Sequence, residues 1–96
     1  MIASFSDDMT EDLFRLHISA KVRRFPAEVR RRARNKLYVL DAATSLADLN
    51  AVPGNHLEAL IGNLAGYHSI RINDQWRVVF KWEENNAKEV RITDYH

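Results

Sequence analysis

The spacing of apolar residues changes once along this 96-residue chain, and that change limits the folds open to it. In the first half, apolar side chains recur at spacings of four and three, which places them on one helix face: Val29, Ala33, Leu37 and Leu40. From His56 onward, apolar and polar residues alternate with the period of two that a half-buried strand requires. Helices followed by strands in one chain predict an α+β fold.

Length and composition narrow the class of protein. Ninety-six residues predict one domain, spanning residues 1–96. The hydrophobic share of 46% and the charged share of 28% are typical of globular proteins rather than disordered ones. We find no apolar run near 18 residues and no basic, apolar leader, so we expect a cytoplasmic protein without a membrane partner. The absence of cysteine excludes disulfides and thiol catalysis.

Several shorter elements complete the expected fold. Residues 2–5 predict an opening strand, and Ser6 is a candidate cap for a first helix with acidic residues in its first turn. Pro26 is expected at the first position of a second helix. Residues 46–49 predict a last helical turn before Pro53-Gly54 breaks the chain.

The register of the central hairpin follows from which side chains must be buried. A three-residue loop at 73–75 pairs Ile70 with Val78 and keeps the apolar residues of both strands on one face. The same register places Arg71 opposite Arg77 on the other face, which we expect to be open. Facing like charges are destabilising, so a bound phosphate would explain the pair.

A basic segment precedes the strands. Residues 21–36 contain eight Lys/Arg and one acidic residue, a charge of +7, whereas the whole chain carries only +1. On the helix, Arg30, Arg31, Arg34 and Tyr38 lie opposite the apolar stripe. Guanidinium groups beside an aromatic ring suit phosphates and bases of RNA. The alternative is a solubilising helix face.

The chain ends with three chemically active side chains. Asp94, Tyr95 and His96 follow a strand that would carry them to the face bearing Arg71 and Arg77. Imidazole suits proton transfer and arginine suits phosphate, so the group could cleave RNA, whose 2′-hydroxyl is the nucleophile. The alternative is an ordinary polar terminus.

Other polar residues carry less weight. His56 follows a Pro-Gly turn and is either a phosphate or base contact or a surface residue. Glu58 is either a spare acid/base group or a solvated strand residue. The histidines and carboxylates lack the usual ligand spacings, so we expect neither a metal nor another cofactor.

Three segments resemble the HigB (plasmid maintenance killer) toxins of the RelE/ParE superfamily. They are residues 53–60, residues 66–78 and the terminal Asp94-Tyr95-His96. The resemblance covers essentially the whole chain. It implies a RelE/ParE-like microfold in which an N-terminal strand and two helices pack on one face of an antiparallel sheet.

The same resemblance implies an activity and partners. The activity would be metal-independent, ribosome-dependent cleavage of mRNA in the decoding site, which stops translation and growth. The partners would be the ribosome, mRNA and a HigA-type helix-turn-helix antitoxin, with operator DNA bound only through the toxin–antitoxin complex. Alternatives are a non-catalytic inhibitor that binds RNA or the ribosome, and a ParE-like gyrase poison.

Carried over to this chain, the catalytic residues would be Arg77, Asp94, Tyr95 and His96. Arg71 is a weaker match. From the residues themselves, the RNA-binding candidates are His56, Arg71, Arg30, Arg31 and Arg34, and relatives often carry arginine where His56 stands. The chain departs from many relatives at Ile61, where they have lysine, and at Asn63-Leu64, where they have Asp-Arg.

Overall fold

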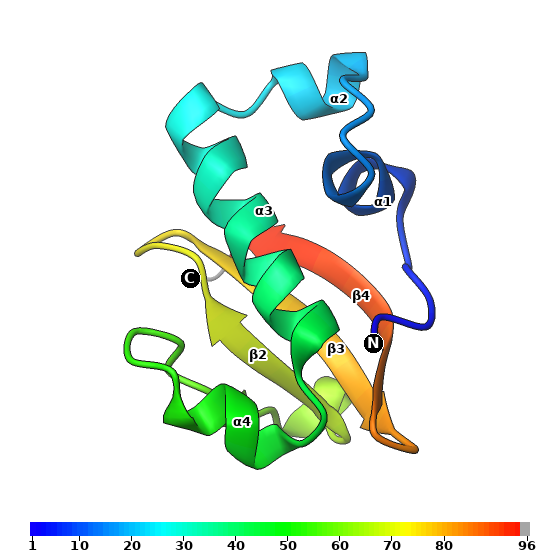
Figure 1. Cartoon of the computed structure of the whole chain (residues 1–96), viewed down its shortest axis with the longest axis vertical. Coiled ribbons are helices and arrows are strands. Elements are labelled where there is room, and N and C mark those ends of the chain that lie inside the picture. Colours follow the sequence, from blue (N-terminus) through cyan, green and yellow to red (C-terminus); the bar gives the residue numbers. More distant parts are fainter. Residues whose placement is uncertain (95–96) are drawn as a thin grey trace.

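The computed structural model describes residues 1–94, and within them four α-helices precede a four-stranded sheet (Figure 1). The helices are α1 (Asp8–Phe14), α2 (Ala20–Arg23), α3 (Ala27–Ala42) and α4 (Leu46–Ala51). The strands are β1 (Glu58–Ala59), β2 (Tyr67–Arg71), β3 (Trp76–Glu83) and β4 (Asn86–Asp94), with the 3₁₀ helix η1 (Gly62–Leu64) between β1 and β2. All neighbouring strands are antiparallel, in the order β1-β2-β3-β4. No helix in this part of the chain is long and apolar enough to span a bilayer.

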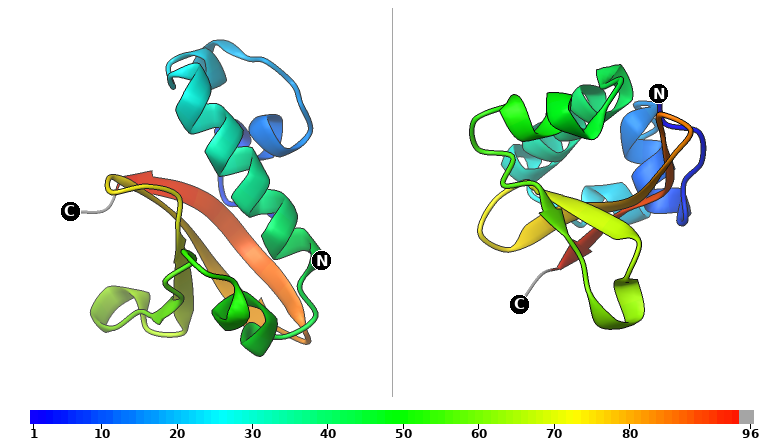
Figure 2. Two further views of the ribbon diagram at one scale, coloured as in Figure 1. Left: turned by 60° about the vertical axis from the view of Figure 1, so that its left-hand side comes forward. Right: turned by 90° about the horizontal axis from the view of Figure 1, so that it is seen from below.

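Helix α3 covers one face of the sheet, as its apolar stripe predicts. Ala33, Leu37 and Leu40 are buried and pack in one core with β-strand residues that include Phe80 and Val90. Figure 2 shows α3 on one side of the sheet, with the segment between α4 and β2 projecting on the other. The helix begins at Ala27, so Pro26 is its N-cap rather than its first residue.

The N-terminal region differs locally from the expectation. Asp7, not Ser6, caps α1, because its carboxylate accepts a hydrogen bond from the Thr10 amide at 2.8 Å. The expected opening strand consists of two isolated parallel bridges to β4, at Ile2 and Phe5. Helix α2 was not predicted, since its four residues are too few to show a helical period.

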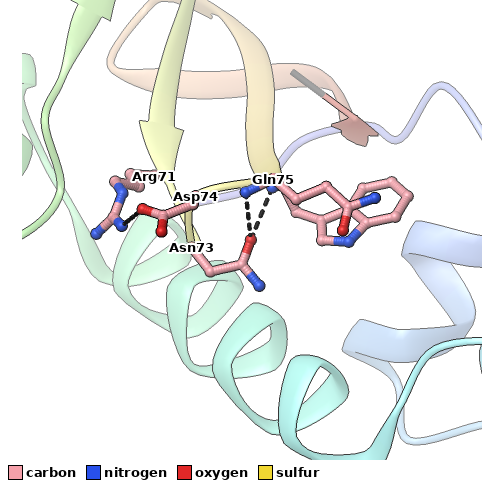
Figure 3. Close-up of polar contacts among 5 residues, drawn as sticks. Arg71, Asn73, Asp74 and Gln75 are labelled. Atoms are coloured by element: carbon pink, nitrogen blue, oxygen red, sulfur yellow. Dashed lines mark hydrogen bonds and ion pairs between the residues drawn. The ribbon is translucent and has the colours of Figure 1, made fainter. Parts of the chain in front are cut away.

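The central hairpin has the predicted register. Ile70 is paired with Val78 and Arg71 with Arg77. The Asn73 side chain fixes the loop, because its Oδ1 accepts hydrogen bonds from the Gln75 amide at 2.9 Å and the Trp76 amide at 2.8 Å (Figure 3). This asparagine turn sets which strand residues face each other, and so brings the two arginines together.

Strand β4 contains one irregularity that affects its charged residues. The β3–β4 register shifts between Val79 and Lys81, and Glu89 has a positive φ of 52°. A β-bulge of this kind bends the strand and re-aims a side chain. The bulge directs the carboxylate of Glu89 onto Lys81 and the hydroxyl of Tyr67.

Candidate active site

The facing arginines Arg71 and Arg77 are each held by a carboxylate. Arg71 forms an ion pair with Asp74 in the hairpin loop. Arg77 donates from Nη1 to Glu58 Oε1 at 3.4 Å and from Nη2 to the carbonyl of His56 at 2.5 Å. These partners offset the repulsion between the two guanidinium groups.

The expectation that Arg77 lies on an open surface was wrong. Its exposed fraction is 7%, and its guanidinium reaches Glu58 of β1 and the carbonyl of His56. Glu58, in contrast, has a side chain that is 50% exposed. A buried guanidinium beside an accessible carboxylate is oriented before any ligand arrives, as a phosphate-stabilising group should be.

The loop before β1 is fixed by the buried side chain of Asn55. Its Nδ2 donates to the Leu49 carbonyl at 2.9 Å, and its Oδ1 accepts from Lys36 Nζ at 2.5 Å. Its own carbonyl accepts from the Arg71 amide at 2.7 Å. Asn55 therefore joins α4, α3 and β2, and it holds the next residue, His56, in a left-handed conformation with φ 46°. The His56 carbonyl reaches Arg77 from that position.

Helix α3 contributes positive charge to the same region through Lys36. Partial burial lowers the pKa of Lys36, and the nearby charges of Arg32 and Arg71 lower it further. The amine stays close to these cations because Asn55 accepts its hydrogen bond. A concentration of positive charge beside the arginine pair favours an anionic ligand.

A second polar cluster lies on the sheet around Tyr67. Its hydroxyl donates to Glu89 Oε1 at 3.1 Å, and Lys81 Nζ lies 3.1 Å from Glu89 Oε2. Lys81 and Arg91 approach the tyrosine ring, at 5.1 and 5.8 Å from its centroid. The hydrogen bond from Lys81 lowers the pKa of Glu89, and the same bond raises the pKa of Lys81. These contacts hold the ring of Tyr67 in one place.

The arginines predicted to bind RNA from α3 have different surroundings. Arg31 is paired with Glu28 at 2.7 Å, and that hydrogen bond lowers the pKa of Glu28. Arg34 donates from Nε to the Leu13 carbonyl at 3.3 Å and so helps to join α3 to α1. Arg30 forms no ion pair with another residue of the described chain. Among the three, Arg30 therefore has the charge most available to a ligand.

Of the predicted terminal group, the structure describes only Asp94. It pairs with Trp76 across β3 and β4, one position beyond the pair of Arg77 with Thr93, and it accepts a hydrogen bond from Gln75 Nε2 at 3.1 Å. Tyr95 and His96 lie outside the described residues. Within residues 1–94, no three histidine or acidic side chains are arranged to hold a metal ion.

A comparison with known families identifies the family of this chain. The family described as "RelE-like toxin of type II toxin-antitoxin system HigB" matches residues 3–96. The chain belongs to this HigB-like toxin family. It is 37% identical to Toxin HigB-1 of Vibrio cholerae over 87 residues, which cover 91% of this chain and 90% of the relative. It is 31% identical over the full length of both chains to a Proteus vulgaris protein named Endoribonuclease HigB.

The fold of this HigB-like toxin also matches solved structures. The YoeB–YefM complex from Staphylococcus aureus aligns with a TM-score of 0.62 at 20% identity, covering 100% of this chain and 98% of the matched chain. The YoeB dimer from the same organism aligns with a TM-score of 0.59. At such identities the likeness concerns the fold, and the α+β arrangement predicted from the sequence is confirmed.

Sequence reasoning undervalued two residues of this toxin site. The sequence alone does not decide whether Glu58 is an acid/base group or a solvated residue, and it indicates no role for Asn55. Alternation can assign a face to Glu58, but it cannot show that this residue of the two-residue strand β1 contacts Arg77, which lies two strands away. The one signal for Asn55 was its position in a Pro-Gly-Asn turn, where a side-chain amide often bonds to backbone.

Proposed function

We propose that this HigB-like toxin is a ribosome-dependent endoribonuclease that cleaves mRNA in the decoding site and thereby inhibits translation and growth. The observation that carries the proposal is the buried Arg77, held against Glu58 and the His56 carbonyl and facing Arg71. The name of the Proteus vulgaris relative supports the same class of reaction.

The proposed reaction uses the substrate's own nucleophile. The ribose 2′-oxygen attacks phosphorus, its proton passes to a base, and the 5′-oxygen leaves with a proton from an acid. Glu58 accepts a hydrogen bond from Arg77, and a carboxylate can serve as the base. Arg77 and Arg71 stabilise the charge on the phosphate. Asp94, Tyr95 and His96 are proposed to orient the RNA and to return the proton.

The proposed partners follow from the family. A type II toxin acts with an antitoxin, and we propose a HigA-type helix-turn-helix protein that alone gives the complex its affinity for operator DNA. The toxin itself would contact the ribosome and mRNA, with Arg30 the first α3 residue to test and Arg31, Arg34 and His56 as further RNA contacts. Because its proposed target is the ribosome, we expect the toxin to act in the cytoplasm.

Primer extension on ribosome-bound mRNA tests the proposal. The toxin should create new 5′ ends, and Arg77→Ala should reduce their yield by at least about a hundredfold, as loss of a transition-state hydrogen-bond donor does. Lys88→Ala is a matched control, because Lys88 is a sheet cation paired with Glu83 at 3.9 Å. Because Arg77 is buried, circular dichroism must show that the variant is folded.

The alternatives predict other results. A non-catalytic inhibitor would stall ribosomes without new 5′ ends. A gyrase poison would leave mRNA intact and change DNA supercoiling. Either result would refute the proposed nuclease activity, and full toxicity after removal of Tyr95 and His96 would refute the roles given to those two residues.

A further inference from the structure

An apolar cavity of about 510 Å³ lies between the helices and the hairpin loop. Met9 of α1 and Val29 of α3 contribute aliphatic walls, and Phe25 and Trp76 contribute aromatic ones. The two rings meet edge to face, with centroids 4.8 Å apart and planes at 71°. The volume is within the range of small-molecule sites, and the walls suit a flat aromatic group.

The rim of this cavity is cationic. Lys21 and Arg24 line it and are exposed. Neither forms an ion pair with any residue in the described part of the chain. On the sheet, by contrast, Arg71, Arg77 and Lys81 each have a carboxylate partner. The positive charge at the rim is therefore available to an anion from outside the chain.

The cavity is next to the proposed reaction site. Gln75 lines it and also donates its side-chain hydrogen bond to Asp94. Figure 3 shows Gln75 on one side of the hairpin loop, with Arg71 and Asp74 on the other. A single strand of RNA bound at the arginines could therefore place a neighbouring nucleotide in the cavity.

We propose that this cavity binds one nucleotide of the RNA substrate, with the base packed against Phe25, Trp76 and Val29 and the phosphate at Lys21 and Arg24. Unstacked bases are commonly held on aromatic side chains, with cations on the adjoining phosphates. An acidic, apolar peptide from a partner would use the same chemistry, but the link through Gln75 to Asp94 of the proposed reaction site favours the substrate. The inference rests on the proposed RNA-cleaving function.

Titration with ribonucleoside 5′-monophosphates, followed by nuclear magnetic resonance of the full-length toxin, tests the cavity directly. The resonance of the Trp76 indole N–H should change its chemical shift as nucleotide is added. Trp82 is an internal control, since it lies six positions further along β3, about 20 Å away along the strand. Inorganic phosphate should bind more weakly than the nucleotides. Equal affinities, or an unmoved Trp76 signal, would overturn the proposal.

Charge reversal supplies a second test. The double variant Lys21→Glu, Arg24→Glu should weaken mononucleotide binding by about tenfold or more, because it removes charge-assisted contacts. Arg23→Glu is the matched control, as Arg23 is exposed on the same helix and does not line the cavity. Equal effects of the two changes would overturn the proposal, and so would loss of antitoxin affinity with unchanged nucleotide binding.

The two proposals can fail separately. If the wild-type toxin shows no ribosome-dependent cleavage but its Trp76 responds to mononucleotides, the nuclease proposal fails and the cavity assignment stands. If cleavage is normal in the double variant and mononucleotides do not bind the wild type, the cavity assignment fails and the nuclease proposal stands.

Discussion

The cations of the sheet and those of the helical region are held in different ways. Four of the five cations on β2, β3 and β4 lie within 4 Å of a carboxylate, namely Arg71, Arg77, Lys81 and Lys88, whereas Arg91 donates to the Thr93 hydroxyl. In residues 21–36, whose net charge is +7, the ion pairs in the described chain include only Arg31 with Glu28. Cations paired with carboxylates have a fixed geometry, which suits catalysis. Unpaired cations produce a positive electrostatic field, which attracts a polyanion.

Among the substitutions that test this contrast, Glu58→Gln should have the largest effect. Glutamine keeps an oxygen for Arg77 but cannot accept the 2′-hydroxyl proton, so cleavage should fall by about a hundredfold while RNA binding stays. Single-turnover cleavage on ribosomes measures the loss. Glu84→Gln is the matched control, because Glu84 is exposed at the β3–β4 turn and forms no ion pair in the described chain. Similar rates in both variants would remove Glu58 from the chemistry.

Asn55→Ala tests whether the sheet site depends on its buried scaffold. The change leaves the Leu49 carbonyl and the Lys36 amine without their partner, which should cost about 2–3 kcal/mol in the free energy of unfolding. Asn50→Ala, at an exposed position in α4, should change stability by less than about 0.5 kcal/mol. Urea denaturation compares the two, and equal values would show that the Asn55 contacts add no net stability.

The sequence was sufficient for α3, β2 and β3 and for the register between these two strands, because these features depend on which apolar residues must be buried. The stripe on α3 and the alternation along β2 and β3 allow one arrangement, and the structure has it. The site was harder to predict. The placement of Glu58 over Arg77 and the bulge at Glu89 depend on side-chain hydrogen bonds between distant segments, and no periodicity reports these.

A smaller effect is expected when the helical cations are compared with one another. Arg30→Ala should weaken association with ribosomes by about threefold to tenfold at low salt and reduce its salt dependence. Arg31→Ala should have less effect, because Glu28 already offsets its charge. Binding measured across a range of salt concentrations separates the two arginines. An equal loss would mean that Glu28 gives up its partner when RNA binds.

Glu89→Gln should give the smallest effect, and its dependence on pH identifies the cause. The folded-state pKa of Glu89 lies below the usual 4.5, so its ionised form stabilises the fold above that pH and the benefit is lost as the pH falls. Lys81 has a pKa raised above 10.5, so its share persists at lower pH and is lost as the pH rises through the raised value. The stability difference between wild type and variant should therefore be largest between these limits and vanish in acid. Because both side chains of the pair are partly exposed to solvent, the difference should be well below that of Asn55→Ala. A difference that did not vary with pH would attribute the effect to the bulge backbone rather than to the charge pair.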